Sequence, residues 1–227
     1  MKLLELERLI VGYHGRPVLG PVDLVVQPGE FWLILGHNGA GKSTLLRTIF
    51  GLLAPVEGTA TVLGLKAQAI TQRKLVIAGA RYLAQRRRVF TDLTVARHRR
   101  LLYDLHGFTG PAYTPLDDPE IGRGRAVGQL SGGQQRLEAM AMLSRSGRLF
   151  LLDEPLVGVD TAHKEVVQAW VQTSLAAGAA FLVVEHDSGQ WWPLVTNVLV
   201  IRSGCATFAG SKAALTKQDD WLVRFYV

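Results

Sequence analysis

The chain has 227 residues, 48% of them apolar, and a formal net charge of +6. This length suits one domain with a sizeable core, and no apolar stretch reaches the roughly 18 residues that a membrane-spanning helix needs, so we expect no transmembrane segment. Charged residues interrupt the apolar N-terminus and argue against a signal peptide, so we expect a cytoplasmic chain. Its one cysteine, Cys205, excludes an internal disulfide, and we expect it to be a small apolar residue inside a strand.

The first 85 residues read as strands around one helix. Two apolar runs, 3–11 and 18–26, are separated by a turn rich in glycine and proline and predict an antiparallel hairpin. The other elements expected here are a strand at 31–35, a helix-like run at 42–53 whose helix should end near Gly51, and strands at 59–63 and 76–83.

From residue 86 to residue 146 glycine, proline and aspartate become frequent, and we interpret this segment as a small helical lobe. Continuous apolar strands then alternate with helices, which predicts a parallel sheet covered on both faces. The expected elements are helices at 95–105 and from Ser131 to about 144, strands at 149–152, 179–184 and 198–202, and helices at 161–177 and 211–217. The chain is thus predicted to be a single α/β domain with a mainly parallel core and an N-terminal antiparallel β subdomain, residues 1–85 and 147–227 forming the core and residues 86–146 the lobe.

The segment from Gly36 to Thr44 matches the phosphate-loop pattern G-x-x-x-x-G-K-[ST] and lies between a predicted strand and a predicted helix. Backbone N–H groups of such a loop converge on phosphate oxygens, and the helix N-terminus adds a partial positive charge. Lys42 would reach the terminal phosphates, and Ser43 would bind Mg²⁺. The nucleotide-binding residues predicted here are Gly36, His37, Asn38, Gly39, Ala40, Gly41, Lys42, Ser43 and Thr44.

A second helix start with two glycines follows Leu130, and its first turn offers another set of backbone N–H groups to a phosphate. One phosphate chain does not need two such ends. The simplest arrangement has two copies of the chain head to tail, with Ser131 and Gly133 of one copy facing the γ-phosphate held by Lys42 of the other. Nucleotide contacts across a dimer are therefore predicted for Ser131, Gly132, Gly133 and Gln134.

Two acids end the apolar run at 149–152. Asp153 would complete the Mg²⁺ shell, and Glu154 beside it would act as the general base for the attacking water. Tyr13, just after the first strand, is a candidate for stacking on adenine, with His14 as a competitor and an ordinary surface tyrosine as the alternative.

Together these motifs resemble the nucleotide-binding subunit of ABC transporters, a P-loop NTPase whose signature is Leu-Ser-Gly-Gly-Gln. The phosphate loop, Gln85, the signature, the acidic strand and His186 occur in family order over nearly the whole chain. The resemblance implies that His186 contacts the γ-phosphate, that Gln85 touches Mg²⁺ and the water, and that Asp160 communicates across the dimer. It also implies ATP and Mg²⁺ as cofactors, a second ATPase subunit and transmembrane permease subunits as partners, and a position at the cytoplasmic face of the membrane.

Arginines are concentrated between Arg81 and Arg100, which predicts either a basic patch for an anionic partner or a solvated helical face. Residues 87–95 are similar to the glutamine-loop region of branched-chain amino acid and urea importer ATPases, where the family receives its membrane subunit. This similarity favours import of such solutes, although an exporter could use the same surface. The competing class is a soluble ABC ATPase acting on nucleic acid or ribosomes. The stretch between Ser43 and Ser131 contains no coiled-coil heptads, which argues against this class.

Overall fold

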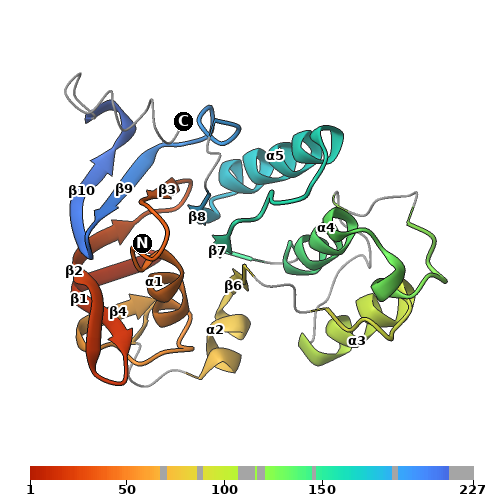
Figure 1. Cartoon of the computed structure of the whole chain (residues 1–227), viewed down its shortest axis with the longest axis horizontal. Coiled ribbons are helices and arrows are strands. Elements are labelled where there is room, and N and C mark those ends of the chain that lie inside the picture. Colours follow the sequence, from red (N-terminus) through yellow and green to blue (C-terminus); the bar gives the residue numbers. More distant parts are fainter. Residues whose placement is uncertain are drawn as a thin grey trace.

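The computed structural model describes residues 1–66, 71–85, 89–106, 116, 121–144, 147–185 and 189–214, with the helix alone given for 102–106. Within these residues the strands form two sheets, and helices α3 and α4 lie to one side of both (Figure 1). The strands are β1 (Leu4–Tyr13), β2 (Arg16–Val26), β3 (Phe31–Leu35), β4 (Glu57–Val62), β5 (Leu65–Lys66), β6 (Ala80–Leu83), β7 (Leu149–Asp153), β8 (Ala180–Val184), β9 (Asn197–Arg202) and β10 (Cys205–Ser211). The helices are α1 (Lys42–Ile49), α2 (Gln72–Ala78), α3 (Val95–His106), α4 (Gly132–Leu143) and α5 (Thr161–Ala176), with short 3-10 turns η2 (Val127–Gln129) and η3 (Lys212–Ala214).

The larger sheet has the order β10-β9-β3-β8-β7-β6, and all its neighbours are parallel except β9 and β10. Every residue of β3, β7 and β8 is buried, because alternate side chains enter two different apolar clusters. In β3, for example, Trp32 and Ile34 face one cluster while Phe31 and Leu33 face the other. The predicted parallel sheet with two covered faces is therefore confirmed.

The smaller sheet, β2-β1-β4-β5, is antiparallel and begins with the predicted hairpin, whose strands meet at Tyr13 and Arg16. Helix α1 lies between the two sheets. Its Leu45, Leu46 and Ile49 are fully buried in one cluster with residues of both sheets, such as Leu4 and Leu151. This packing fixes the start of α1, and with it the phosphate loop, against both sheets.

Some expected elements were wrong. The first half of the predicted strand 76–83 belongs to helix α2, which ends at Gly79 in a left-handed conformation. Its β-branched Ile77 is 73% exposed, which shows that the apolar run at 76–83 did not mark one buried strand. At the other end of the chain, strand β10 was not foreseen, and Cys205, expected to be buried, is exposed at its first residue.

The helix at 211–217 was also misjudged, whereas the helix that begins at residue 42 agrees with the expected end near Gly51. Helix α1 ends at Ile49, and Gly51 follows with a positive φ of 71°. Ser211 ends β10, and a single 3-10 turn, Lys212–Ala214, takes the place of the expected helix as far as the description reaches. The apolar segment 221–227, which we expected to pack on a neighbour, lies outside the described residues.

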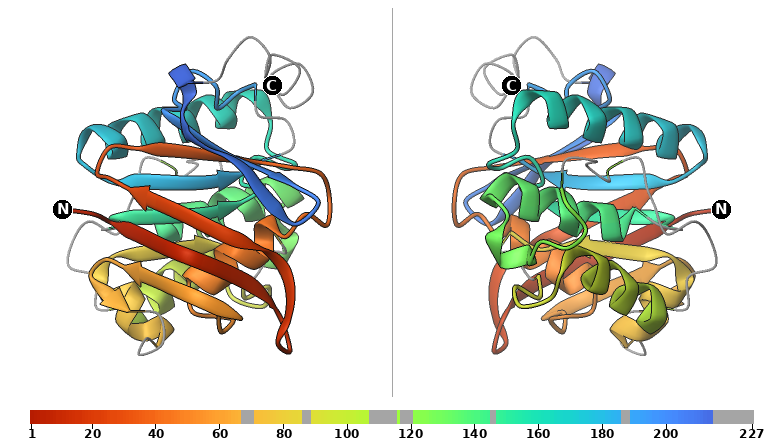
Figure 2. Two further views of the ribbon diagram at one scale, coloured as in Figure 1. Left: turned by 90° about the vertical axis from the view of Figure 1, so that its left-hand side faces the viewer. Right: turned by 90° about the vertical axis from the view of Figure 1, so that its right-hand side faces the viewer.

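Helices α3 and α4 with η2, here called the helical lobe, lie on the side of the molecule opposite the β1–β2 hairpin (Figure 2). The lobe has its own small cluster of buried residues, namely Val95, Ile121, Val127 and Leu130. Helix α4 also reaches the main core, because Leu137 and Met140 pack in the cluster that contains Phe150 and Phe181. Helix α4 is thus the element that joins the lobe to the sheet.

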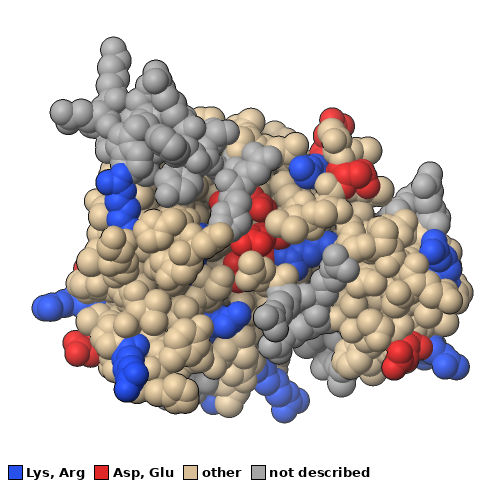
Figure 3. Space-filling view, viewed as in Figure 1, with Lys and Arg blue, Asp and Glu red and all other residues tan. Residues whose placement is uncertain are grey.

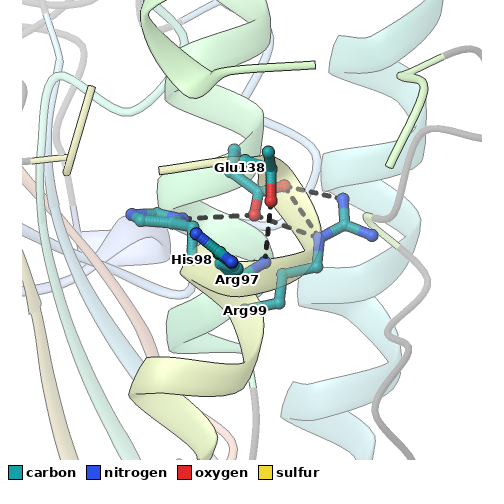
Figure 4. Close-up of polar contacts among 5 residues, drawn as sticks. Arg97, His98, Arg99 and Glu138 are labelled. Atoms are coloured by element: carbon teal, nitrogen blue, oxygen red, sulfur yellow. Dashed lines mark hydrogen bonds and ion pairs between the residues drawn. The ribbon is translucent and has the colours of Figure 1, made fainter. Parts of the chain in front are cut away.

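A buried carboxylate holds α3 against α4 (Figure 4). Glu138 of α4 accepts hydrogen bonds from Arg99 Nη2 at 2.6 Å and Arg99 Nε at 3.0 Å, and His98 Nδ1 lies 3.4 Å from its Oε1. The Glu138 and His98 side chains are almost inaccessible to solvent. Burial acts to raise the pKa of Glu138, but the hydrogen bonds from His98 and Arg99 and their charges outweigh it, so the pKa is lowered.

Replacing Glu138 by alanine should lower the free energy of unfolding by about 3–5 kcal/mol, because it leaves the partners of a buried ion pair uncompensated. Since the folded-state pKa of Glu138 lies below its unfolded value, its contribution is complete above the unfolded value and is lost as the pH falls through the folded value. The wild-type free energy of unfolding should therefore decrease on acidification, and Glu138→Gln should weaken this dependence.

Urea unfolding at neutral and acidic pH measures both effects. Glu165→Gln, at an exposed position of α5, is the matched control and should leave stability and its pH dependence unchanged. A Glu138→Gln protein with the wild-type pH dependence would contradict this account.

Candidate nucleotide site

The phosphate loop connects β3 to α1 at the carboxyl end of the larger sheet. Gly39 and Gly41 have positive φ values of 79° and 96°, as such a tight loop requires. At Gly41 a side chain would also lack room, because a Cβ atom would lie 2.8 Å from the Cβ of Leu19 in β2. The two glycines thus let the loop curl over the start of α1, where the helix dipole favours an anion.

A pocket of about 360 Å³ opens at this loop and brings together residues that are distant in sequence. Tyr13 and Val18 from the hairpin line it, as do Gln85, Glu154 and Val184 from the ends of other strands. The remaining lining residues belong to the loop and the start of α1: Asn38, Gly39, Ala40, Gly41, Lys42, Ser43 and Thr44. The structure therefore places Tyr13, Gln85 and Glu154 around the phosphate loop.

Lys42 folds back over the loop that carries it. Its ammonium group donates to the carbonyl oxygens of Gly36 at 2.5 Å and His37 at 3.0 Å, and the residue is only 6% exposed. Burial lowers the pKa of Lys42, while the charges of Glu154 and Asp153 act in the opposite direction. Gly36 and His37 therefore bind the Lys42 ammonium group through their backbone carbonyl oxygens.

Tyr13 reaches the first turn of α1 from the end of β1. Its hydroxyl lies 3.2 Å from Thr44 Oγ1 and accepts a hydrogen bond from Arg47 Nη1 at 3.3 Å. The residue is 39% exposed at the edge of the pocket, a position from which a ring can stack on a base. His14, the competing candidate, occupies the exposed hairpin turn with a positive φ of 51°.

Asp153, the last residue of β7, is completely buried, and within the described ranges no hydrogen-bond partner is found for either carboxylate oxygen. Burial raises the pKa of Asp153, and the Ser43 hydroxyl close by acts in the opposite direction. Unpaired buried carboxylate oxygens next to a hydroxyl form the hard oxygen donor set that Mg²⁺ prefers. The Asp153 carboxylate and the Ser43 hydroxyl therefore fit a magnesium ion, and Gln85 lines the same pocket as Ser43. No cluster of three His, Cys, Asp or Glu residues suited to a metal occurs in the part of the chain that the structure describes.

Glu154 follows Asp153 in a left-handed conformation with φ 52°, which is uncommon for a residue with a side chain. Its N–H donates to the carbonyl of Val184 at 2.8 Å, and its Oε1 accepts a hydrogen bond from Gln85 Nε2 at 3.0 Å. This backbone turn directs the carboxylate into the pocket instead of along the strand. On the face seen in Figure 3, acidic side chains gather near the middle of the molecule, between the core and the helical lobe.

The signature segment, Leu130–Gln134, starts helix α4. Ser131 is its N-cap: the Gln134 N–H donates to Ser131 Oγ at 3.2 Å, and the Ser131 N–H donates to Gln134 Oε1 at 3.1 Å. Gly133 touches the loop after β7, since a Cβ atom there would lie 2.2 Å from the carbonyl oxygen of Gly158. Among the described residues, none of this segment lines the pocket of its own chain.

Asp160 caps helix α5 and is exposed. Its carboxylate accepts hydrogen bonds from the His163 N–H at 3.0 Å and lies 2.6 Å from His163 Nδ1. These hydrogen bonds lower the pKa of Asp160. Asp160 is therefore exposed, two residues after Gly158, which touches Gly133 of the signature segment. Its role between subunits stays a prediction.

The expected arginine patch is divided by the fold. Arg81 is buried and Arg99 is bound to Glu138, whereas Arg97 and Arg100 are exposed on α3. Residues 86–88 lie outside the described part of the chain, as does His186.

Two buried charged residues next to the site were missed by sequence reasoning. Glu185 follows β8, and its Oε2 accepts a hydrogen bond from the Leu156 N–H at 3.2 Å, which holds the loop after Glu154. Arg136 of α4 donates hydrogen bonds to backbone carbonyls next to the site. Arg136 lies four residues before buried Met140, a spacing that could have placed it on the buried face of α4.

None of the helices in the described ranges is both long enough and apolar enough to cross a membrane. The family model described as ABC transporter matches residues 19–157. The chain is 33% identical to the Fe(3+) ions import ATP-binding protein FbpC of Streptomyces avermitilis over 98% of this chain and 67% of that one. It is 31% identical to the zinc transport system ATP-binding protein TroB of Treponema pallidum, over 91% of this chain and 82% of that one.

The fold agrees with solved structures. An ATP-binding subunit of an ABC transporter superposes with a TM-score of 0.87 at 23% identity, covering 98% of this chain and 99% of the other. A dimeric ATP-binding cassette in a post-hydrolysis state with ADP and Pi gives a TM-score of 0.79 at 22% identity, covering 92% of this chain and 98% of the other. The chain therefore belongs to the ABC transporter family and is one of its ATP-binding, ATP-hydrolysing subunits.

Proposed function

We propose that two ATP-binding cassettes, of which this chain is one, close head to tail around two ATP molecules and drive solute movement through separate membrane subunits at the cytoplasmic face of the membrane. The single observation that carries this proposal is the pocket that joins the phosphate loop to Tyr13, Gln85 and Glu154. It supplies a stacking ring, a phosphate cradle and a carboxylate in one chain.

Each group has a defined task in hydrolysis. Tyr13 stacks on the base, the N–H groups of the phosphate loop hold the β- and γ-phosphates, and Lys42 leaves its two carbonyl acceptors to bind the γ-phosphate. A bound Mg²⁺, held by Ser43, Asp153 and Gln85, would neutralise phosphate charge. Glu154 accepts the proton of the attacking water, and His186 steadies that water.

Three observations support a dimer. The N–H groups at the start of α4, on Gly132 and Gly133, are not used by the pocket of their own chain. Ser131 and Asp160 are exposed, so they are available to a second subunit. A cassette of the same fold has been solved as a dimer with ADP and Pi. ATP would favour the closed state because only there does the signature segment complete the site.

The transported solute is set by the membrane subunits. The two curated relatives described above are named for Fe(3+) and zinc. Another, 29% identical over 98% of this chain and 66% of the other, is a spermidine/putrescine import protein of Spiroplasma citri. These names support import, and the similarity of residues 87–95 to amino-acid and urea importers stays a prediction about the solute.

The mass in solution of the Glu154→Gln protein, with and without Mg-ATP, tests the dimer. We expect ATP to convert a monomer into a dimer, because slow hydrolysis prolongs the closed state. Glu154→Gln combined with Ser131→Arg should bind ATP and stay monomeric, since the added side chain blocks the signature face.

A dimer that persists in the doubly substituted protein would contradict the head-to-tail arrangement. A monomer in every condition would contradict a homodimer and point to a different second subunit, to be sought among proteins that copurify from native membranes. Salt-dependent retention on DNA or RNA would support the competing nucleic-acid class.

A further inference from the structure

Arg136 is a charged residue in the interior of the protein, only 3% exposed. Its side chain leaves α4 and donates from Nη1 to the carbonyl oxygens of Ala84 at 2.6 Å and Gln85 at 3.3 Å. From Nη2 it donates to the carbonyl of Glu154 at 2.7 Å and to that of Asp153. Burying a guanidinium is costly unless its donors are used, and here two nitrogens serve four backbone oxygens.

The four carbonyls share one location. Ala84 and Gln85 follow the last residue of β6, while Asp153 ends β7 and Glu154 follows it. Strands β6 and β7 are parallel neighbours whose pairing ends at Leu83 and Leu152. The Arg136 guanidinium therefore binds the two segments that follow β6 and β7, just where the strand pairing between them ends.

These two segments carry Gln85 and Glu154, and the inference rests on the proposed function, which assigns to them the magnesium ion and the attacking water. Gln85 and Glu154 are joined by a hydrogen bond of 3.0 Å, and both line the nucleotide pocket. The Glu154 backbone has an unfavourable φ of 52°, which persists only when the surroundings determine it. Its N–H is fixed by Val184, and its carbonyl by Arg136.

We propose that Arg136 is a positioning residue for ATP hydrolysis: through four backbone carbonyls it fixes the ends of β6 and β7 and so holds Gln85 and Glu154 in place. Because Arg136 belongs to α4, a displacement of the signature helix would move the backbone of Glu154 with it. The residue touches neither nucleotide nor water in this role.

Arg81 provides a matched control at the opposite end of β6. It is 4% exposed, and its Nη1 donates to the carbonyls of Val76 at 2.7 Å and Ala80 at 2.9 Å. Burial lowers the pKa of Arg81 to about 10. Removing either arginine deletes a buried guanidinium bound to backbone oxygens, but only Arg136 lies beside the site.

The test compares Arg136→Met, Arg136→Lys and Arg81→Met in the full chain. The first measurement is hydrogen–deuterium exchange of a peptide covering residues 153–157, which contains the amides of Glu154 and Leu156. We expect exchange there to be faster in Arg136→Met than in Arg81→Met. The second measurement is steady-state ATP hydrolysis, where Arg136→Met should reduce kcat about tenfold or more and leave KM within about threefold, as a misplaced base does.

Arg136→Lys keeps a donor near the carbonyls and should recover part of the loss in kcat, which a purely steric role would not predict. Equal exchange of residues 153–157 in Arg136→Met and Arg81→Met would overturn the proposal, whether or not the isolated chain turns over measurably. An equal loss of kcat in those two variants would do the same. If Arg136→Met does not fold, Arg136→Lys is judged against Arg81→Met by the same two criteria.

Discussion

Replacing Glu154 by glutamine should slow ATP hydrolysis by about two orders of magnitude or more while leaving ATP binding intact. Glutamine has the size and hydrogen-bonding reach of glutamate, so the contact with Gln85 and the lining of the pocket are retained. An amide cannot accept a proton from the attacking water. The change therefore removes the chemical step and spares the binding step.

Phosphate release and nucleotide affinity measured on the same protein separate these steps. Glu57→Gln, at an exposed position of β4, is the control and should hydrolyse ATP at the wild-type rate. Unchanged turnover in Glu154→Gln would remove Glu154 from the base role, and a large loss of affinity would mean that the carboxylate serves to bind nucleotide.

Lys42→Ala should act on the other step and weaken ATP binding about 30-fold or more, which corresponds to the roughly 2 kcal/mol or more lost when a buried charged contact is truncated. Lys42 is the basic side chain of the phosphate loop itself, and its ammonium lies inside the pocket, shielded from solvent. A charge in such surroundings interacts strongly with phosphate.

A titration with a fluorescent ATP analogue measures this loss. Lys74→Ala, at an exposed position of α2, should bind as the wild type does. Thermal unfolding of both variants shows whether the loop has collapsed, because Lys42 also binds the carbonyls of Gly36 and His37. Normal affinity in a folded Lys42→Ala protein would contradict our interpretation of the loop.

The elements that could be predicted are those whose pattern is local. Strand Leu149–Asp153 is apolar on both faces because it is central in a parallel sheet, and Ser131 heads a capping box that marks the start of α4. The elements that were missed depend on distant partners. Strand β10 has an exposed, alternating pattern and exists because it pairs with β9, and α2 carries β-branched residues that suggested a strand.

The candidate site divides in the same way. The phosphate loop, Gln85 and Glu154 could be singled out because each belongs to a motif, and Tyr13 because of its place after the first strand; all of them line one pocket. Arg136 and Glu185 were missed because their partners are backbone groups far along the chain, and backbone groups leave no trace in a sequence. A count of charges in the arginine cluster likewise did not show that Arg81 and Arg99 turn inward.

The strand order has a consequence for folding during synthesis on the ribosome. Strand β3, which carries the phosphate loop, pairs only with β8 and β9 among the described strands, and these emerge about 150 residues later. Until then its apolar residues have no sheet to join, and the loop has no fixed strand behind it. Nucleotide binding should therefore appear only when synthesis is nearly complete, so that a truncated chain lacking β8 and β9 would not capture ATP.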